Sequence, residues 1–414
     1  MIKTGEPVPY LPAEHEDRLF RAGLMAETLH RRGHEVTWWN AQFHHQLKHM
    51  RDVTPSVPVR PDADGPEMIF LPSRGYAKNI SLARFRDHAE LRREFERLAP
   101  TLPRPDVIIC AWPTIDLADA AVRFGKAHGI PVILDVRDLW PDILYERITA
   151  KTGLPFKGYL IPYERSARRA MRGATSVTSI TDGMLDWAQR RFGRTQSTRD
   201  RVFHQSQNPE THMPDTEFWA AKGAHLKAPK TRLVWAGTLI SDLDIQTLLA
   251  AIEALPDSAA RELEFVFCGS GDLTPQIEKM AARLPHVIYG GWVSQGALQA
   301  LYQASHIGMM CYLDRFDFQL SIPNKVADFT RSGLRILTNL QGEMERVLGP
   351  ENLLIRYPTG DVNALREVLV RIAEHPQTYR AAAPEGPEIF AKLFDARAVM
   401  DEFVAHVEEI SKAP

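Results

Sequence analysis

The chain has 414 residues, of which 44% are hydrophobic and 25% are charged, as in an ordinary folded protein. At about 150 residues per domain, this length predicts two or three domains. No stretch contains the ~18 consecutive apolar residues that a membrane-spanning helix needs, which argues against an integral membrane protein of that kind.

The three cysteines, Cys110, Cys268 and Cys311, lie inside or beside apolar runs. Their spacing matches neither a zinc site nor a disulfide framework, so they are predicted to be buried thiols in a reducing compartment. The first ten residues, MIKTGEPVPY, lack the basic and apolar regions of a secretory signal. We therefore expect a cytoplasmic protein.

Charge is distributed unevenly along the chain. Residues 1–205 contain 31 Lys and Arg against 25 Asp and Glu, a net charge of +6, whereas the remainder contains 19 against 27, a net charge of -8. The basic patches at 91–98, 163–173 and 188–201 are either solvated helix faces or a surface that attracts an anionic membrane leaflet with a lipid-linked substrate. No nucleic-acid module accompanies the charge, so nucleic acid is not the expected partner.

The membrane alternative depends on one segment, in which four arginines follow an apolar run. These residues are Arg165, Arg168, Arg169 and Arg172, and Phe156, Tyr159, Leu160, Ile161 and Tyr163. An apolar edge flanked by arginines can lie on a bilayer without crossing it. This alternative predicts peripheral association with the inner face of a membrane through the N-terminal domain.

In the first half, strands and helices are predicted to alternate. A helix ends at Gly33 and is followed by a strand at 34–39. Further strands are predicted at 106–112, 130–138 and 176–181, with a helix at 118–129. The strand at 130–138 is almost continuously apolar, as expected for a parallel strand buried on both faces. The segment MIKTG is too short for a full first strand, and we expect the true start to lie upstream.

The alternation starts again after a polar break. Strands are predicted at 231–237, 263–271, 286–292, 306–312 and 335–339, with helices between them. Such alternation indicates a parallel sheet covered by helices on both sides. The predicted fold is therefore α/β, with two doubly wound parallel-sheet Rossmann-like domains facing a cleft. We place them at 1–206 and 207–393, and expect the amphipathic tail 394–414 to pack back on the first domain.

The segment SIPNKVADFTRSG, residues 321–333, combines features of an anion site. Ser321 can cap a helix and Pro323 can occupy its first turn, which leaves backbone N–H groups for a phosphate. Lys325 adds a positive charge, and Asp328, one turn later, can accept hydrogen bonds from the vicinal hydroxyls of a ribose. The pattern predicts a nucleoside diphosphate pocket. The alternative is a capped helix with a surface ion pair between residues i and i+3.

Three glycine-bearing loops follow strands of the same half. They are GTLISD at 237–242, CGSGD at 268–272 and YGGWVS at 289–294. All are predicted at the carboxyl ends of parallel strands, where open α/β sheets bind ligands. Each loop alone is a weak signal, and their convergence in one domain strengthens the pocket hypothesis.

Together these segments resemble the retaining glycosyltransferases of family 4, which have the GT-B fold. The resemblance includes LMAETLHRRGHEVTWW and PVILDVRDLWPD in the first half, and VWAGTL, FCGSGDL, YGGWVSQGALQALYQASHIGMMCY and SIPNKVADFTRSGLRILTN in the second. The last segment is similar to the P-N-K variant found in bacterial surface-polysaccharide enzymes. The resemblance implies transfer of a UDP-linked hexose or N-acetylhexosamine to a lipid-linked or glycan acceptor, without metal or other cofactor.

The resemblance also implies roles for individual residues. Asp328 holds the ribose, Lys325 and the helix start hold the diphosphate, and Val293, after Trp292, contacts the base. Arg137 and Asp138 lie beside the reacting sugar, so Arg137, Asp138 and Lys325 are the predicted catalytic residues. The predicted donor-binding residues are Gly5, Glu6, Gly237, Thr238, Gly269, Gly271, Trp292, Val293, Ser321, Pro323, Asn324, Lys325 and Asp328.

The chain departs from the family pattern at Leu320, where many members carry an acidic residue, and in the absence of basic residues after GTL. These departures keep two other classes open, a catalytically weak GT-B partner subunit and a sugar-nucleotide epimerase on the same fold. We find no carboxylate suited to be a nucleophile and favour attack from the face that the leaving group occupies. The departing phosphate would then take the acceptor's proton.

Three further patterns have simpler explanations. Asp242 and Asp244 form a D-x-D that is expected to begin a helix rather than bind a metal. The histidines at 44, 45 and 49 lack the glutamate of a zinc protease and are expected to form a surface or acceptor-side cluster. The tryptophans at 38, 39 and 235 are expected in the core.

Overall fold

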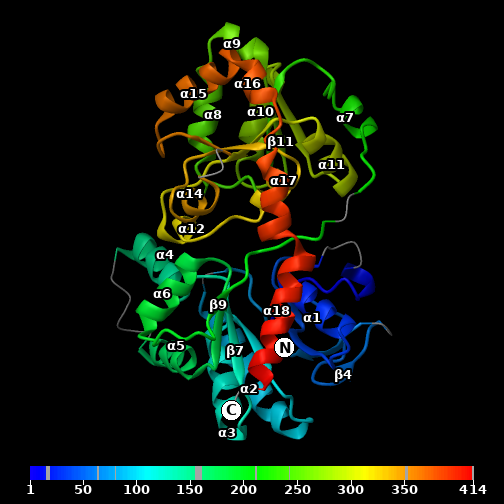
Figure 1. Ribbon diagram of the computed structural model, residues 1–414, viewed down its shortest axis with the longest axis vertical. Coiled ribbons are helices and arrows are strands. Elements are labelled where there is room, and N and C mark those ends of the chain that lie inside the picture. The colour runs from blue at the N-terminus through cyan, green and yellow to red at the C-terminus, as the bar shows by residue number, and fades with distance from the viewer. Residues whose placement is uncertain are drawn as a thin grey trace. The chain divides into compact units, whose positions relative to one another are not determined.

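The computed structural model describes residues 1–14, 19–62, 65–79, 81–153, 161–209, 212–241, 243–349 and 353–412. The chain divides into two compact units, residues 1–205 with 396–414 and residues 206–395. Each unit contains a mainly parallel sheet with helices on both faces (Figure 1). The predicted pair of Rossmann-like domains is confirmed.

Unit 1 is built on a sheet with the strand order β4-β5-β1 followed by β6-β7-β8-β9. Ile2 joins the two parts, because it pairs in parallel with both Trp39 of β1 and Cys110 of β6. The short first strand predicted from the sequence is thus a three-residue segment at the centre of the sheet. The strands are β1 Thr37–Ala41, β2 Phe43–His44, β3 His49–Met50, β4 Pro58–Val59, β5 Glu67–Leu71, β6 Ile108–Trp112, β7 Val132–Val136, β8 Ser176–Ser179 and β9 Arg201–Val202.

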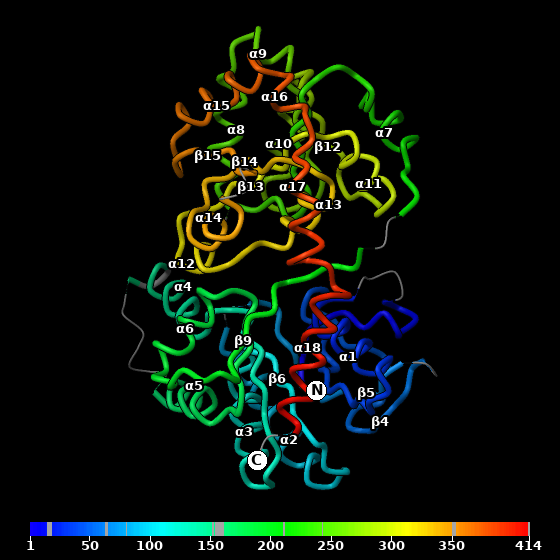
Figure 2. Tube along the Cα trace, viewed as in Figure 1, coloured from blue at the N-terminus to red at the C-terminus, as the bar shows by residue number. Residues whose placement is uncertain are grey.

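The two faces of this sheet receive different helices. Ile109 and Ile133 point to α1 and α18, whereas their neighbours Cys110 and Leu134 point to the core on the other face, because successive strand residues alternate. Figure 2 shows α18 beside α1, although they are far apart in the chain. The helices are α1 Arg21–Arg31, α2 Leu82–Leu98, α3 Ile115–His128, α4 Asp142–Thr152, α5 Ile161–Gly173, α6 Asp182–Phe192 and α18 Ala396–Ser411, with short 3-10 turns at Pro12–Glu14 and Ala99–Thr101.

Unit 2 contains one fully parallel sheet with the order β12-β11-β10-β13-β14-β15. The chain first moves outward from β10 to one edge and then returns to start again at β13. The strand order therefore reverses between β10 and β13, and such switch points are where doubly wound sheets bind ligands. The strands are β10 Thr231–Ala236, β11 Leu263–Cys268, β12 Val287–Gly291, β13 Ile307–Met310, β14 Arg335–Thr338 and β15 Leu354–Arg356.

The helices of unit 2 pack their apolar faces on both sides of this sheet around one large core. They are α7 Glu217–Ala221, α8 Ile245–Glu253, α9 Asp257–Glu262, α10 Thr274–Arg283, α11 Gln295–Gln303, α12 Phe316–Gln319, α13 Lys325–Arg331, α14 Gly342–Leu348, α15 Val362–Glu374, α16 Pro376–Arg380 and α17 Glu385–Ile389, which continues into a π-helical turn at Phe390–Phe394. The three cysteines and the tryptophans at 38, 39 and 235 are buried, as predicted. Among the described residues, no helix is both long enough and apolar enough to cross a membrane.

The predicted membrane-facing edge is wrong in part. Tyr163 is buried and packs edge-on against Phe85 at 5.4 Å, because the apolar face of α5 turns toward α3 and the core. Arg169 forms an ion pair with Asp119 at 2.5 Å, and the Arg172 Nε donates to the carbonyl of Phe192. Phe156, Tyr159 and Leu160 lie outside the described residues.

A buried carboxylate ties β7 of unit 1 to α1. Asp135 of β7 is fully buried and accepts two hydrogen bonds of 3.0 Å from the Arg21 guanidinium and one of 2.9 Å from Thr178. Arg137 lies 2.5 Å away on the other side. Burial alone would raise the pKa of Asp135, but the two arginines hold the pKa below its usual range, so the carboxyl stays ionised.

We predict that Arg21→Met lowers the free energy of unfolding of unit 1 by about 3 kcal/mol. Breaking a buried pair typically costs about 3–5 kcal/mol, and the lower value applies because Arg137 remains as a partner. Urea denaturation followed by circular dichroism measures the change. The control is Arg32→Met, which removes an ion pair between Arg32 and Asp401. Their side chains are 46% and 51% exposed, so this substitution should lower the free energy of unfolding by less than about 1 kcal/mol. Equal shifts in the two variants would contradict this account of Asp135.

Candidate functional site

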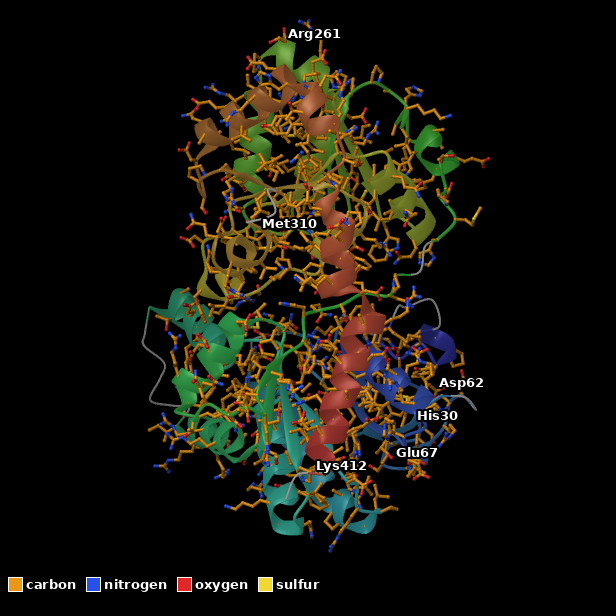
Figure 3. All side chains as sticks on the ribbon, in the orientation of Figure 1. His30, Asp62, Glu67, Arg261, Met310 and Lys412 are labelled. Atoms are coloured by element: carbon orange, nitrogen blue, oxygen red, sulfur yellow. The ribbon has the colours of Figure 1, made fainter. Side chains whose placement is uncertain are left out.

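The candidate site of unit 2 lies at the carboxyl ends of its parallel strands, next to the switch point. The loops after β10, β11 and β12 begin on this edge, and β13 pairs with β10 in the same sheet. Met310, the last residue of β13, is labelled in Figure 3. The glycine-bearing loops were predicted at this edge, and the structure confirms their position.

The three loops are packed backbone against backbone. The N–H of Gly237 donates to the carbonyl of Cys268 at 3.0 Å, and the N–H of Gly269 donates to the carbonyl of Gly291 at 2.7 Å. A Cβ on Gly269 would lie 2.0 Å from the oxygen of Gly237, and a Cβ on Gly271 would lie 2.1 Å from the oxygen of Leu239. Packing between loops therefore accounts for Gly269 and Gly271 without any ligand.

Gly237 instead makes room for Lys325. Gly237 has a φ of +133°, and a Cβ there would lie 2.8 Å from the Lys325 Cε and 3.2 Å from its Nζ. The Lys325 ammonium lies 3.6 Å from the centre of the Trp235 ring, in cation–π contact. Residues from β10, its following loop and α13 thus meet at one point.

The Lys325 ammonium is buried and has no hydrogen-bond partner among the described residues. Burial lowers the pKa of Lys325 to about 7, although the nearby Cys311 and Asp328 favour the charged form. A buried cation without a hydrogen-bonding partner is unfavourable by itself. Within the described residues, the hydrogen-bonding capacity of the Lys325 ammonium is therefore unused.

The helix containing Lys325 begins later than predicted. α13 starts at Lys325, its N-cap residue is Asn324, and no side chain caps it. Ser321 is not a cap, because its hydroxyl donates to the carbonyl of Phe318 at the end of α12, and Pro323 precedes the helix rather than occupying its first turn. With only seven residues in α13, the lysine rather than the helix end is the main positive feature.

Asp328 lies on the same helix, but the predicted alternative of a surface ion pair with Lys325 is wrong. The Lys325 ammonium is buried and lacks a hydrogen-bond partner, and one Asp328 carboxylate oxygen accepts from the Gln207 amide at 3.3 Å. The other oxygen lies 3.9 Å from Arg331. The Asp328 carboxylate is thus held by Gln207 and lies near Arg331.

The remaining predicted residues of unit 2 surround this point more loosely. Thr238 is exposed after β10, and Trp292 is 85% exposed after β12. Val293 packs partly against the core. Asp317, the nearest acidic residue to Leu320, forms a two-bond ion pair with Arg315 at 3.0 and 2.7 Å.

The other predicted residues, Gly5, Glu6, Arg137 and Asp138, belong to unit 1 and cluster there. Arg137 forms ion pairs with both Asp135 and Glu6, and the second Glu6 oxygen accepts from the N–H of Ala22 at 2.9 Å. The charge of Arg137 is therefore balanced within the unit. Asp138 accepts from the N–H of Leu139 at 2.8 Å, as a residue that shapes its loop.

The D-x-D pattern and the histidines at 44, 45 and 49 have structural contacts of their own. Asp244 accepts from the Thr247 hydroxyl at 2.5 Å and from the N–H of Gly360 at 3.2 Å, while Asp242 lies outside the described residues. His44 is buried and stacks on His49, so of the two predicted alternatives, a surface or an acceptor-side cluster, the surface position is wrong for His44. The described residues contain no group of three or more acidic, histidine or cysteine side chains that could hold a metal.

Sequence reasoning missed the second role of Trp235, whose ring supports the lysine as well as the core. The sequence signal that could have indicated this role was the position of Trp235, two residues before Gly237. It also missed Lys3, Arg84 and His88, which line a cavity of unit 1. Lys3 could have been noticed because it directly precedes the Gly5 turn.

Comparisons with known proteins agree with this geometry. Residues 20–202 match the model of the glycosyl transferase 4-like domain, and residues 230–375 match that of the glycosyl transferases group 1. Comparison of the sequence with curated proteins gave no match.

Solved structures with the same fold cover almost the whole chain. Sucrose-phosphate synthase from Thermosynechococcus elongatus is 14% identical with a TM-score of 0.71, over 94% of this chain and 92% of the other. HepE from Anabaena in complex with UDP is 10% identical with a TM-score of 0.65, over 99% of each chain. WaaG, a glycosyltransferase involved in lipopolysaccharide biosynthesis, is 14% identical with a TM-score of 0.61, over 100% of each chain.

The two matching domain models and the shared architecture define a glycosyltransferase of the GT-B fold. Within that class, the chain belongs to the glycosyltransferases whose first half is a glycosyl transferase 4-like domain and whose second half is a glycosyl transferases group 1 domain.

We predict that Lys325→Met stabilises the ligand-free protein by about 1–3 kcal/mol at pH 6–7, because the substitution removes a buried polar group without a partner. The pKa of Lys325 is about 7 in the folded chain and lies below the ordinary lysine value of 10.5, so the unfolded chain binds more protons between these values. The penalty is thus fully present below about pH 7 and shrinks as the pH rises toward 10.

Urea midpoints at pH 6.5 and pH 9 test both statements. The control is Lys279→Met, which changes an exposed lysine of α10 in the same unit. If Lys325→Met were less stable than the parent protein at pH 6.5, the ammonium would have a structural partner and this assignment would fail.

Proposed function

We propose that this glycosyltransferase uses a UDP-linked sugar, holds it in unit 2 without metal, and transfers the sugar with retention of configuration. The observation that supports this most directly is the buried Lys325 ammonium over Trp235, which has no hydrogen-bond partner among the described residues. A diphosphate is a ligand of suitable charge, and the exposed Gly237 beside the lysine has no side chain that would block its approach.

The other contacts of the proposed donor site follow from the same edge. Asp328 lies one turn after Lys325 on α13 and can accept hydrogen bonds from the ribose hydroxyls, and Gln207 donates a hydrogen bond to its carboxylate. Trp292 and Val293, after β12, provide a face for the base. The likeness to HepE, whose structures contain UDP and UDP-glucose, supports UDP as the nucleotide.

In the proposed reaction the acceptor hydroxyl attacks from the face that the leaving diphosphate occupies, and the departing phosphate oxygen takes the acceptor's proton. Negative charge develops on the diphosphate as the glycosidic bond breaks. Lys325 stabilises that charge, and in a site closed to water one such contact is worth on the order of 3 kcal/mol, roughly a hundredfold in rate. Arg137 has its own carboxylate partners, so we assign it and Asp138 to positioning the loop after β7 beside the reacting sugar.

The proposed acceptor is a lipid-linked or other glycan of surface-polysaccharide synthesis, which the resemblance to family 4 and the likeness to WaaG support. Leu320 favours a second candidate, a catalytically weak partner subunit, because the family's usual acidic contact to the donor sugar is missing there. Incubation with UDP-sugars and lipid-linked acceptors separates the candidates. Transfer supports the glycosyltransferase, isomerisation of the sugar nucleotide supports an epimerase, and no turnover supports the partner subunit.

The proposed attraction of unit 1 to a lipid surface depends on Ile161, Arg165 and Arg168 of α5, which are exposed.

We predict that Lys325→Ala weakens UDP binding about a hundredfold, whereas Lys279→Ala leaves it unchanged, because only the first removes a charge contact to the diphosphate. Isothermal titration calorimetry with the full chain measures both. EDTA should leave UDP affinity and turnover unchanged. Loss of turnover with EDTA and recovery with manganese would overturn the metal-free proposal, and unchanged UDP affinity in Lys325→Ala would overturn the site.

We predict that Asp138→Asn and Arg137→Lys lower kcat at least tenfold while the KM for the donor changes less than threefold, because both residues position the reacting centre rather than the nucleotide. The amide that replaces the Asp138 carboxylate keeps an oxygen that can accept from the N–H of Leu139, so the loop should stay folded. Steady-state kinetics at saturating acceptor provide the values, and thermal melting checks folding. Near-normal kcat in both variants would limit these residues to a structural ion-pair role.

A further inference from the structure

Unit 1 contains a cavity of about 240 Å³ at the carboxyl edge of its own sheet. The cavity opens where residues 1–3 and β6 lie side by side, which is the point where the strand order of this sheet reverses. Lys3, Gly5, Thr114 and Arg137 line it from the strand ends, and α2 forms another wall. By position alone it is a place where a doubly wound sheet binds a ligand.

The cavity contains one cation held firmly by its backbone. The N–H of Lys3 donates to the carbonyl of Trp39 at 3.0 Å, and the Trp38 indole donates to the carbonyl of Lys3 at 3.0 Å. Lys3 lines the cavity, and no hydrogen bond or ion pair joins its ammonium to any described residue. Burial, and then the nearby Arg137, lower the pKa of Lys3, whereas the charges of Glu6, Asp138 and Asp135 raise it.

Arg84 of α2 supplies a second cation. Its guanidinium lies over the rings of Trp140 at 4.5 Å and Tyr76 at 5.4 Å, and one of its amino groups donates to the carbonyl of Asn79 at 2.9 Å. No carboxylate of the described chain is within ion-pair distance of it, and its Nε has no partner there. Aromatic stacking thus orients the guanidinium without neutralising it.

The acidic groups of the wall are engaged elsewhere. Asp87 accepts from the N–H of Gly75 at 2.9 Å, and Asp138 accepts from the N–H of Leu139 at 2.8 Å. The third cation, Arg137, is balanced by Asp135 and Glu6. Within the described residues, the positive charges of Lys3 and Arg84 therefore remain without an ion-pair partner.

Two neutral imidazoles complete the cavity. His88 is 4% exposed, lines the wall, and has no hydrogen-bond partner for its Nδ1 among the residues that the structure describes. Burial lowers the pKa of His88 to about 3 and that of His45 to about 4, so both rings are neutral at neutral pH. His45 lies 2.5 Å from the Tyr76 hydroxyl. Neutral imidazoles can both donate to and accept from sugar hydroxyls.

We propose that this cavity binds a sugar with an anionic substituent, a phosphate or a carboxylate, through Lys3 and Arg84, with His88 and His45 as partners for its hydroxyls. That the bound sugar is the acceptor rests on the function proposed above, whereas the binding site itself does not. Two cations without an ion-pair partner among the described residues favour an anion, and the buried His88 Nδ1, which has no hydrogen-bond partner there, favours a hydroxyl-bearing ligand over a bare ion.

The test is calorimetry on the full chain at pH 7 with glucose 6-phosphate, glucuronate and glucose as probes. At least one anionic probe should bind tenfold or more tightly than glucose. Lys3→Met and Arg84→Gln should each weaken that binding at least tenfold, and Lys126→Met, at an exposed position of α3, should not change it. Lys3→Met should keep or raise the melting temperature, because it removes a cation that has no partner.

A cross-comparison with unit 2 separates the two proposals. Lys3→Met should lose the anionic sugar and keep UDP, whereas Lys325→Met should lose UDP and keep the anionic sugar. Three outcomes would overturn the cavity proposal and leave the donor site unaffected. Glucose could bind as tightly as the anionic probes, or a protein that binds UDP could bind none of the probes. Binding of the anionic sugar could also be lost in Lys325→Met instead of in Lys3→Met. A protein that binds the anionic sugar through Lys3 but not UDP would retain the cavity and refute the proposed donor. Preference for glucose 6-phosphate or for glucuronate identifies the anion.

Discussion

A charge buried in a protein interior costs several kcal/mol unless an opposite charge is buried with it, and both units are organised around this cost. The buried charge of Asp135 is balanced, because Arg21 and Arg137 form ion pairs with its carboxylate and the Thr178 hydroxyl donates a further hydrogen bond to it. That network fixes α1, β7 and the loop after β7 relative to one another. Glu6, bound to Arg137, extends the network to the turn at Gly5, so the predicted reaction loop of unit 1 depends on it.

Lys325 and Lys3 show the opposite case, because neither ammonium has a hydrogen-bonding or ion-pair partner in the described chain. Each stays in place for a reason unrelated to charge: Lys325 lies over the Trp235 ring and beside the bare backbone of Gly237, and Lys3 is held by strand hydrogen bonds. Stability is lost at both positions in the ligand-free chain. A functional site commonly has this property, since an anion regains the lost interaction only when it binds.

Both lysines lie at the switch point of a doubly wound sheet, and both sheets follow the same winding order. The shared fold explains why ligands gather there, but it does not select them, since GT-B neighbours with 10–14% identity include proteins of different named activities. Selection comes from side chains. In unit 2 Lys325 lies beside the glycine loop after β10, as suits a diphosphate, whereas the unit 1 cavity adds neutral imidazoles suited to hydroxyls.

The sequence by itself determined the alternation of strands and helices, the glycine loops at strand ends and the spacing of Lys325 and Asp328, because these depend on local periodicity and backbone freedom. It could not determine that Ser321 leaves the helix uncapped, that Tyr163 turns into the core, or that Lys325 lies over Trp235. Each of these depends on which face of a helix or loop is buried when the elements pack together. The cavity of unit 1 was also invisible. Lys3, Arg84 and His88 meet only because the first three residues enter the middle of the sheet and α2 folds across its edge. Pairing and burial of residues so distant in the chain are properties of tertiary packing, and these decide which charges are neutralised and which remain for a ligand.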